Sequence, residues 1–572
     1  MTIEEALATP SLAADASRTW KVLLVAPRFH GLSFWNMTET CAVFGARTPA
    51  PPTGLITVAA MLPAHWQCRL VDRNTEELID ADLEWADLVM TGGMMPQRID
   101  TLAVIEVAQT HGRPVVVGGP DVTSSPEAYE GADFRVLGEA EGIIDEFIAA
   151  WNSGDRRGTF EAEKFKADVT KTPIPRYDLL KRDQYMYYGV QFARGCPFTC
   201  EFCDIIELYG RVPRVKNAEQ LLAELDRLYE LGYRGHLDFV DDNFIGNKKA
   251  LKAFLPHLIS WQKEHGYPFG FSTEASVNLS DDAAMLALMR EANFFTIFVG
   301  IESPDTDTLI LMQKKQNTRR SLADSIHKIY RAGMSVNAGF IVGFDSEKAS
   351  VADAMVELIE AAAIPVAMVG LLFALPNTQL TRRLKAEGRL LPQEFLYQFA
   401  ELGQGDQCAM GLNFHTARPR RDILADQKQI LQRVYSVDAY YGRARTMLGM
   451  LDRPRQDRSR APEFFQRTLG ISGRDLRLIG RLFWRIWRRQ PEAFGRFCRL
   501  FFTTLRRNPE NLGCVFMSAS FYLHLGPFAR HVVSVLERRI AAIPEDGDGL
   551  EVLGNTPVLG RPEPEKALAI AS

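Results

Sequence analysis

Six strand–helix repeats constrain the fold of this chain more than any other feature of its sequence. Short apolar stretches, each with a helical pattern before the next, occupy residues 188–194, 236–240, 269–273, 296–300, 336–342 and 366–372. Strands that alternate with helices form a parallel sheet, because each helix returns the chain to the edge where the next strand begins. A complete (β/α)8 barrel needs eight such units. Six repeats therefore predict an α/β unit smaller than a closed barrel.

Three cysteines lie close together in the loop after the first of these strands. Cys196, Cys200 and Cys203 have C-x3-C-x2-C spacing within the sequence RGCPFTCEFC. Three thiolates on one loop can hold three corners of a cubane iron–sulfur cluster, and a fourth cysteine completes an electron-transfer cluster. No fourth cysteine lies nearby, so one iron would keep an open position. A zinc knuckle and three unrelated cysteines are the alternatives, but the Cys/His pair that a zinc knuckle needs does not follow.

The composition is typical of a soluble globular protein with about three or four domains. The chain has 572 residues, of which 46% are hydrophobic and 24% are charged, and its net charge is −5. This small charge predicts no general attraction to nucleic acid or membranes. Eight cysteines, only three of them clustered, indicate cytosolic usage and not a disulfide framework. With no signal-peptide pattern and no long apolar run, we expect a cytoplasmic protein, with peripheral membrane contact left open.

A second α/β unit precedes the six repeats. Apolar strands are predicted at residues 21–27, 69–72, 88–91, 115–117 and 134–137, with helices at 53–62, 97–109 and 141–151. This alternation predicts a doubly wound parallel sheet, whose ligands bind at the carboxyl ends of its strands. Gly92, Gly93, Gly118 and Gly119 follow two of these strands. No G-x-G-x-x-G follows the first strand, so a dinucleotide is disfavoured, and a domain that only supports the next one is the alternative.

Further motifs resemble the cobalamin-binding radical S-adenosylmethionine (AdoMet) superfamily. They are the cysteine spacing, DIIELYGRVPRVK at residues 204–216, PAPPTGLITVAAMLP at 49–63, DRN at 72–74, TGG at 91–93 and VGGPDVT at 117–123. The subgroup that these stretches resemble includes hopanoid and bacteriochlorophyll methylases, and the likeness covers most of residues 20–385. It implies a cobalamin-binding domain, a partial (β/α)6 barrel, and three cofactors: a [4Fe-4S] cluster, AdoMet and cobalamin. The Asp-x-His-x-x-Gly motif that supplies a histidine to cobalt is absent.

The resemblance also implies roles for individual residues. Cys196, Cys200 and Cys203 would be the cluster ligands, and Phe202 would lie by the adenine of AdoMet. Residues 241–243 would face its amino group, and the stretches around Glu274 and Glu302 its ribose and methionine. The full set of expected cofactor-binding residues is Phe202, Asp241, Asp242, Asn243, Glu274, Gly300, Glu302, Ser303 and Gly339 in the barrel, with Gly92, Gly93, Gly118 and Gly119 before it. Each could instead be a cap or a salt-bridge partner, and no catalytic acid or base is assigned.

The activity implied by the resemblance is methylation of an unactivated carbon. AdoMet cleavage would give a 5′-deoxyadenosyl radical that takes hydrogen from the substrate, and cobalamin would deliver the methyl group. A small-molecule or lipid-like substrate of the hopanoid type is favoured, with flavodoxin or ferredoxin as electron donor and no nucleic-acid partner. Radical oxidation, cyclisation or rearrangement without methyl transfer is one alternative. A non-catalytic sensor that carries cobalamin and a cluster is another.

Helical patterns replace strands in the C-terminal part. The predicted division is a leader at 1–18, a cobalamin-binding domain at 19–150, a linker at 151–184, a partial barrel at 185–385, a helical domain at 386–543 and a tail at 544–572. One helix is predicted at 427–450. Residues 474–507 interleave arginine with aromatic residues and break at Pro491, which suits either a membrane surface or a helix covering the barrel. Cys408 is a packing residue or approaches the active site.

Overall fold

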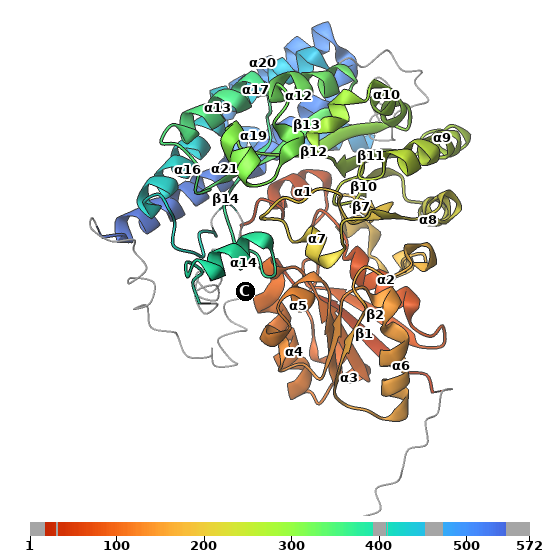
Figure 1. Ribbon diagram of the computed structural model, residues 1–572. Coiled ribbons are helices and arrows are strands. Elements are labelled where there is room, and N and C mark those ends of the chain that lie inside the picture. Colours follow the sequence, from red (N-terminus) through yellow and green to blue (C-terminus); the bar gives the residue numbers. More distant parts are fainter. Residues whose placement is uncertain (1–17, 30–31, 393–407, 409, 452–472, 545–572) are drawn as a thin grey trace, which may run out of the picture.

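The computed structural model describes residues 18–29, 32–392, 408, 410–451 and 473–544. Nearly all of the predicted leader and tail lies outside these described residues. Two parallel sheets and a layer of C-terminal helices make up the described chain, with the first sheet at the bottom of Figure 1 and the second above it. This arrangement confirms the predicted α/β fold class.

The first sheet has six parallel strands in the order β2-β1-β3-β4-β5-β6. The strands are β1 (Lys21–Ala26), β2 (Gln67–Asp72), β3 (Leu88–Gly92), β4 (Val115–Gly118), β5 (Phe134–Leu137) and β6 (Gly158–Glu161). Helices α2 (Thr53–Met61) and α6 (Ile144–Ser153) cover one face, and α3 (Asp80–Trp85), α4 (Arg98–Thr110) and α5 (Pro120–Ser124) cover the other. The predicted double winding is therefore present. Strand β6 lies in the stretch predicted as a linker, where charged neighbours obscure its short alternating pattern.

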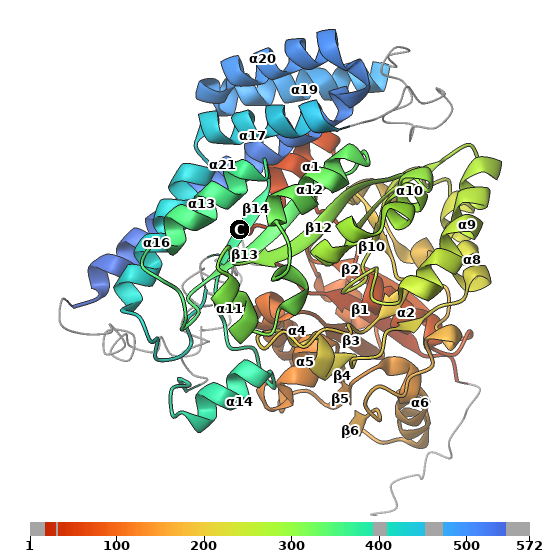
Figure 2. The same cartoon turned by 45° about the horizontal axis from the view of Figure 1, so that its top comes forward.

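The second sheet contains the six predicted repeats in the order β14-β13-β12-β11-β10-β7, all parallel. Its strands are β7 (Tyr188–Val190), β10 (Gly235–Phe239), β11 (Phe269–Glu274), β12 (Phe294–Glu302), β13 (Ser335–Val342) and β14 (Ala367–Leu371). Helices α8 (Ala218–Glu230), α9 (Lys248–Glu264), α10 (Ala283–Glu291), α12 (Leu322–Arg331) and α13 (Val351–Ala361) line its outer face (Figures 1 and 2). Because β7 and β14 are not paired, the barrel is partial and open on one side.

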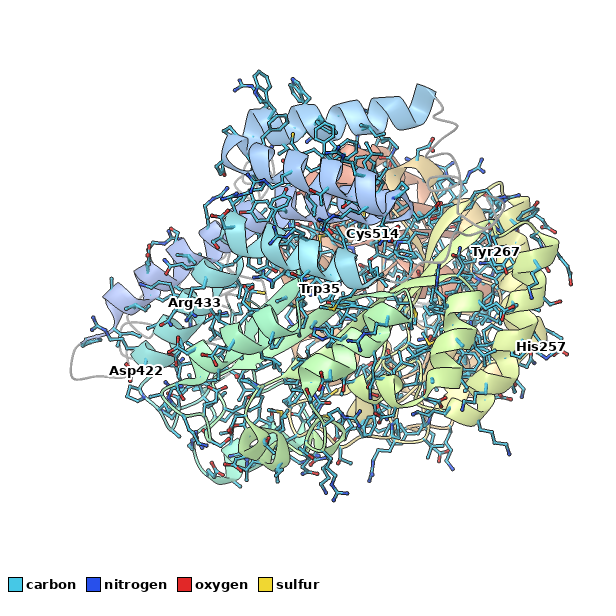
Figure 3. All side chains as sticks on the ribbon, turned by 90° about the horizontal axis from the view of Figure 1, so that it is seen from above. Trp35, His257, Tyr267, Asp422, Arg433 and Cys514 are labelled. Atoms are coloured by element: carbon cyan, nitrogen blue, oxygen red, sulfur yellow. The ribbon has the colours of Figure 1, made fainter. Side chains whose placement is uncertain are left out.

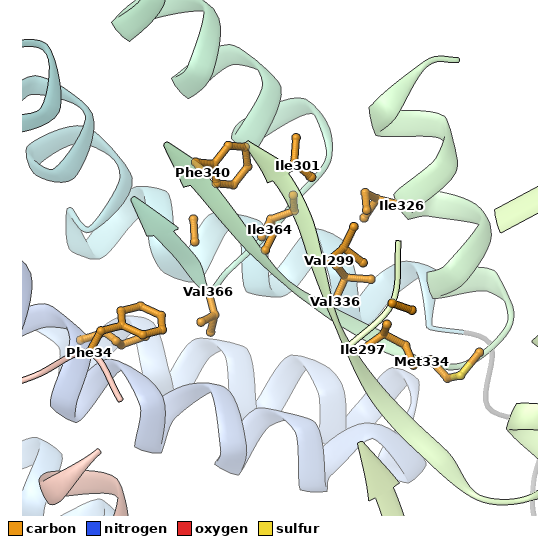
Figure 4. Packing of buried hydrophobic residues seen from close by; sticks show 14 of the residues in the cluster. Phe34, Ile297, Val299, Ile301, Ile326, Met334, Val336, Phe340, Ile364 and Val366 are labelled. Atoms are coloured by element: carbon orange, nitrogen blue, oxygen red, sulfur yellow. The ribbon is translucent and has the colours of Figure 1, made fainter. Parts of the chain in front are cut away.

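The two faces of the barrel strands differ in burial. On β12, Ile297, Val299 and Ile301 are fully buried, and Figure 4 shows them among residues of β13 and α12 such as Val336 and Ile326. Their neighbours with side chains on the other face retain solvent-accessible surface. Side chains alternate between the two faces of a strand, so the exposed set lines the interior of the barrel. These interior side chains therefore remain accessible to solvent.

Six described α-helices follow the last barrel strand in the chain. They are α14 (Gln379–Ala386), α16 (Arg420–Val434), α17 (Val437–Met450), α19 (Gly473–Arg489), α20 (Pro491–Arg507) and α21 (Leu512–Ala542). Helix α16 packs on β14 and α13, and α21 packs on α16. The short helix α1 (Thr38–Phe44), which follows the first strand of the chain, packs against α21 and α19. The N-terminal and C-terminal parts of the chain therefore meet beside the barrel.

The single helix predicted at 427–450 is wrong, because the chain breaks between α16 and α17. The Tyr435 hydroxyl donates to the backbone oxygen of Ala367 on β14 at 2.7 Å, which fixes the break over that strand. Ser436 then caps α17, with its hydroxyl accepting from the backbone N–H of Ala439 at 3.4 Å. Serine is a strong helix N-cap. The helical spacing of apolar residues continues across the break, so this spacing alone did not reveal where the helix ends.

One helix in the described chain, Pro509–Ala542, is long and apolar enough to cross a membrane. Of its most apolar window, 83% is buried inside the protein. Phe528 of this helix meets the ring of Phe34 at 6.1 Å, and His524 Nε2 lies 2.7 Å from the backbone oxygen of Ser33. The helix therefore packs as a core element that anchors the segment before α1.

Candidate functional site

A buried ion network joins the cysteine loop to the ligand edge of the first sheet. The Arg194 guanidinium donates to Glu141 at 2.7 and 3.0 Å and to Glu139 at 3.1 Å. Arg214 lies 2.8 Å from Glu139. Both glutamates follow the carboxyl end of β5. Burial alone would raise the pKa of Glu141, but the bonds from Arg194 lower it below its usual value. The network therefore fixes the cysteine loop between the carboxyl ends of the two sheets.

Replacing Arg194 with methionine is expected to lower the free energy of unfolding by about 3 kcal/mol, because buried carboxylates lose their partner. The matched control is Arg176→Met, which breaks a half-exposed pair with Asp178 and should cost less than about 1 kcal/mol. Denaturant unfolding of the cofactor-free chain measures both. Equal effects of the two substitutions would contradict the structural role of the network.

The three thiols of the loop lie in a desolvated environment. Burial raises the pKa of Cys196 and Cys203 above the usual thiol value. The side-chain nitrogen of Asn243 lies 3.8 Å from the sulfur of Cys196, and that of Gln316 lies 3.8 Å from the sulfur of Cys200. Such thiols release protons when a metal binds them. This donor set of three thiols and two nearby amides fits a [4Fe-4S] cluster, whose iron atoms are held by thiolates.

No group of three or more His, Cys, Asp or Glu side chains in the described ranges is arranged to hold a single metal ion. The three ligands of a cubane need no such convergence, since each thiolate binds a different iron atom. Cys408 lies apart from these three cysteines. Its side chain is 1% exposed and belongs to the main hydrophobic core, as expected for a packing residue.

Residues 241–243, which follow β10, hold the start of the cysteine loop. The Asp241 carboxylate accepts from the backbone N–H of Phe192 at 2.9 Å and also from that of Ala193. Asp242 accepts from the N–H of Gly195 at 3.2 Å. Burial raises the pKa of Asp241 to about 8 and that of Asp242 to about 6. The two aspartates and Asn243 thus support the loop.

A second buried ion pair lies next to the thiols. Lys314 Nζ is 2.5 Å from Glu302 Oε1 and 5.8 Å from the ring centre of Phe202. Burial alone lowers the pKa of Lys314, but Glu302 and the thiols of Cys200 and Cys203 raise it above the usual value. The cation would therefore offset negative charge on a cluster bound by these cysteines.

The backbone is adapted to this ion pair. Glu302 has a φ of 67°, a conformation that costs free energy in a residue other than glycine and often occurs at functional sites. A Cβ at Gly300 would lie 2.4 Å from Glu302 Oε1 and 2.8 Å from Lys314 Nζ. A Cβ at Gly339, beside Gly300 on β13, would meet the Phe298 ring at 3.3 Å. Ser303 is fully buried and accepts from the N–H of Asp305.

The barrel interior contains a polar network that the sequence analysis did not single out. Ser272 Oγ lies 2.6 Å from His236 Nε2 and donates to the Asp238 carboxylate. Burial lowers the pKa of His236 to about 3, so the ring is neutral at neutral pH. The signal was present in the sequence, because His236 and Asp238 stand two residues apart in an otherwise apolar strand and so share a face. Trp35 was also missed: it follows β1 and packs against Phe298 at 5.7 Å (Figure 3).

The Glu274 side chain faces the same interior, is exposed to solvent there, and has no hydrogen-bond partner among the described residues. Desolvation, helped by Asp238, Asp242 and Glu302, raises its pKa from 4.5 to about 8.

This raised pKa of Glu274 predicts a pH-dependent stability. Between pH 4.5 and about pH 8 the folded chain keeps a proton on Glu274 that the unfolded chain has released, so the free energy of unfolding falls as pH rises. We therefore expect Glu274→Gln to flatten the decline in unfolding temperature of the cofactor-free chain from about pH 5 to about pH 8. Glu357→Gln, on the exposed face of α13, is the control, and identical profiles would contradict the expectation.

The glycine turns of the first sheet allow close backbone contact at its ligand edge. A Cβ at Gly92 would lie 2.1 Å from the backbone oxygen of Gly118, and a Cβ at Gly93 would lie 2.7 Å from Gln97 Oε1. Gly119 has a φ of 94°. The Thr91 hydroxyl at this edge is buried and has no hydrogen-bond partner in the part of the chain that the structure describes. A bare edge with an unsatisfied hydroxyl fits a large cofactor such as cobalamin. Two histidines of this domain were considered as cobalt ligands: His65 precedes β2 and lies at the opposite edge, and His30 lies outside the described residues.

Three family models match the chain in sequence. A B12 binding domain matches residues 40–148, the Radical SAM superfamily matches residues 190–359, and a domain of unknown function (DUF4070) matches residues 378–538. The first match contains strands β2 to β5 of the first sheet, and the second contains the cysteine loop and strands β10 to β13 of the second sheet.

Curated relatives extend this result along the chain. An uncharacterized methyltransferase of Synechocystis sp. is 43% identical over 492 residues, which cover 86% of this chain and 88% of the relative. The hopanoid C-2 methylase of Rhodopseudomonas palustris is 41% identical over 345 residues, covering 60% of this chain and 65% of that protein. A bacteriochlorophyllide d C-12(1)-methyltransferase of Chlorobaculum tepidum is 22% identical and covers 65% of this chain and 80% of its own.

Solved structures share the fold at low sequence identity. The cobalamin-dependent AdoMet radical enzyme OxsB with aqua-cobalamin has a TM-score of 0.56 at 14% identity and covers 94% of this chain and 84% of its own. The radical AdoMet methyltransferase TsrM from Kitasatospora setae has a TM-score of 0.51 at 15% identity, covering 65% and 78%. Together with the family models and the Synechocystis relative, they confirm the resemblance seen in the sequence. The chain belongs to the cobalamin-binding radical AdoMet superfamily, as a methyltransferase whose cofactors are a [4Fe-4S] cluster, AdoMet and cobalamin.

Proposed function

We propose that this protein methylates an unactivated carbon of a lipid-like, hopanoid-type substrate. The observation that carries the proposal is the 41% identity to the hopanoid C-2 methylase over 345 residues. The interior of the barrel supports it, since Trp35 and Phe298 offer an apolar surface to a hydrocarbon. Radical oxidation or cyclisation without methyl transfer is the competing reaction.

In this proposal the cofactors bind at the residues expected from the sequence. Cys196, Cys200 and Cys203 would hold three irons of the cluster, and Phe202 would lie by the adenine of AdoMet. The remaining AdoMet-binding residues would be 241–243, Glu274, Gly300, Glu302, Ser303 and Gly339, and Gly92, Gly93, Gly118 and Gly119 would bind cobalamin. When bound, these groups supply the radical that takes hydrogen from the substrate and the methyl group that replaces it.

The protein's own residues position these groups. The Glu302–Lys314 pair is oriented by its 2.5 Å contact and places a cation beside two of the thiols. Asp241 and Asp242 hold the backbone that leads into the cysteine loop. With its pKa raised to about 8 by desolvation and neighbouring carboxylates, Glu274 is largely protonated at neutral pH. The neutral carboxyl adds no charge beside a hydrocarbon substrate.

The reaction also needs a one-electron donor, for which a flavodoxin or ferredoxin is proposed. We place the enzyme in the cytoplasm, peripheral to the membrane, because that location gives access both to the donor and to a lipid-like acceptor. Nucleic acid is not expected as a substrate.

The test is anaerobic turnover of the reconstituted enzyme with AdoMet that carries a deuterated methyl group and with a hopene as acceptor. Mass spectrometry is expected to find the label in the hopanoid and 5′-deoxyadenosine in equivalent amount. Formation of 5′-deoxyadenosine with no label in any product would exclude methyl transfer and favour the competing reaction. Label transfer to a non-hopanoid acceptor only would keep the methyltransferase and reject the substrate.

A further inference from the structure

The helical hairpin formed by α19 and α20 is amphipathic, and its outer face has no partner among the described residues. Its inner face packs on the rest of the protein through buried residues, which are Leu482, Ile486, Ala493, Phe497 and Leu500. On the outer face Trp484, Trp487 and Phe502 are 57%, 58% and 57% exposed, and Leu505 is 41% exposed. Large apolar side chains gathered in this way mark an interaction surface more often than a solvated one.

Arginines surround these exposed apolar side chains. Residues 478–510 contain eight arginines and two glutamates, in a chain whose net charge is −5. Glu39 pairs with Arg485 and Arg489, and Asp438 pairs with Arg496. The exposed arginines that make no ion pair within the described chain are Arg481, Arg488, Arg499, Arg506 and Arg507. The hairpin therefore presents a strongly positive rim.

Helical spacing places the two kinds of residue on the same faces. On α19, Trp484 is three residues after Arg481, Trp487 is three residues after Trp484, and Arg488 is four residues after Trp484. On α20, Arg499, Phe502, Leu505 and Arg506 have the same spacing. Residues at these steps lie on one side of a helix. Figure 2 shows the hairpin as the outermost layer of the molecule, on the side away from the first sheet, and Figure 3 shows side chains projecting outward from its helices.

We propose that this face, formed by Trp484, Trp487, Phe502 and Leu505 with the five unpaired arginines, docks on the surface of an anionic lipid bilayer. Tryptophan and phenylalanine enter the boundary between headgroups and acyl chains, and arginines bind lipid phosphates. A second copy of the chain does not fit this surface, because two positive rims would repel each other. The positive charge of the hairpin complements a negatively charged membrane, although the whole chain is acidic.

The structure also connects this face to the barrel interior. Arg485 and Arg489 of α19 pair with Glu39 of α1, at 2.9 Å for Arg485. The segment just before α1 carries Trp35, which packs on Phe298 inside the barrel. A docked hairpin would therefore lie at one end of a continuous set of contacts that leads to the interior. The docking surface itself does not depend on which substrate is methylated.

The test is flotation of the full-length protein with vesicles of phosphatidylcholine alone and of phosphatidylcholine with phosphatidylglycerol. We expect at least tenfold more bound protein on the anionic vesicles, and loss of this binding at high salt. Trp484→Ser/Trp487→Ser and Arg488→Glu/Arg499→Glu/Arg506→Glu should each reduce binding at least tenfold. The charge-matched control is Lys164→Glu/Lys166→Glu/Lys171→Glu, which reverses three exposed lysines near the first sheet and should bind as the unchanged protein does.

Circular dichroism checks that each variant is folded. The proposal is overturned if folded protein ignores anionic vesicles or if the hairpin variants bind as well as the control. Suppose that the protein does not bind vesicles, and that the hairpin variants instead lose binding to single-stranded RNA or dissociate a dimer. The proposal is then overturned as well. The assay contains no AdoMet and no methyl acceptor, so its result is independent of the proposed reaction.

Discussion

Replacing Cys203 with alanine is expected to prevent assembly of the iron–sulfur cluster while leaving the fold intact. Only three cysteines lie in the loop, and no other cysteine is positioned near them in the described chain. With one ligand removed, iron content after anaerobic reconstitution should fall below about a tenth of the unchanged protein's, because cluster assembly needs its full ligand set. Production of 5′-deoxyadenosine from AdoMet should be lost with it.

The matched control for this prediction is Cys498→Ala, since Cys498 is also partly buried but lies on α20, far from the loop. It should keep full iron content and AdoMet cleavage. The thermal unfolding temperature of both cofactor-free variants should stay close to that of the parent chain, because burial of a neutral thiol contributes little beyond packing. Full iron content in Cys203→Ala would contradict the three-cysteine assignment.

Much of the fold was predictable because its signals are local. The six barrel strands and the first five strands of the N-terminal sheet are short apolar runs, and each is separated from the next by a helical pattern or a glycine turn. Strand β6 was missed because Gly158–Glu161 has only four residues in a charged stretch and pairs solely with β5. The break at Ser436 was missed for the opposite reason, since the apolar period runs on across it.

Candidate cluster ligands could be proposed from the sequence, but the contacts that support their loop could not. The cysteine spacing identifies the loop because three thiols must come from one short segment. The partners of that loop come from distant segments: Arg194 meets Glu139 and Glu141, which are more than fifty residues earlier in the chain. Trp35 reaches the barrel interior from the end of β1. Such contacts follow from the packing of two sheets against each other, which no local pattern specifies.

Substituting Gly300 with alanine is expected to disrupt the Glu302–Lys314 pair. The φ of Gly300 is not in the left-handed region, so alanine can adopt its backbone conformation, and lack of space is the obstacle. The new Cβ would lie 2.4 Å from Glu302 Oε1 and 2.8 Å from Lys314 Nζ, well inside van der Waals contact. Both groups are buried, so they cannot separate without leaving a charge unpaired. The expected loss in unfolding free energy is about 2–3 kcal/mol, within the range for overpacking and for a weakened buried ion pair.

The matched control is Gly339→Ala, one strand away and in register with Gly300. Its Cβ would meet the ring of Phe298 at 3.3 Å and the Met368 Cε at 3.8 Å, and a ring can shift by a few tenths of an ångström, so the cost should stay below about 1 kcal/mol. AdoMet binding separates a steric effect from a functional one, because Lys314 lies beside Cys200 and Cys203. Equilibrium dialysis with the reconstituted protein should show at least tenfold weaker AdoMet binding for Gly300→Ala and a smaller change for Gly339→Ala. Equal losses of stability and of AdoMet affinity in the two variants would mean that the ion pair has no special part in the site, and that both glycines serve packing alone.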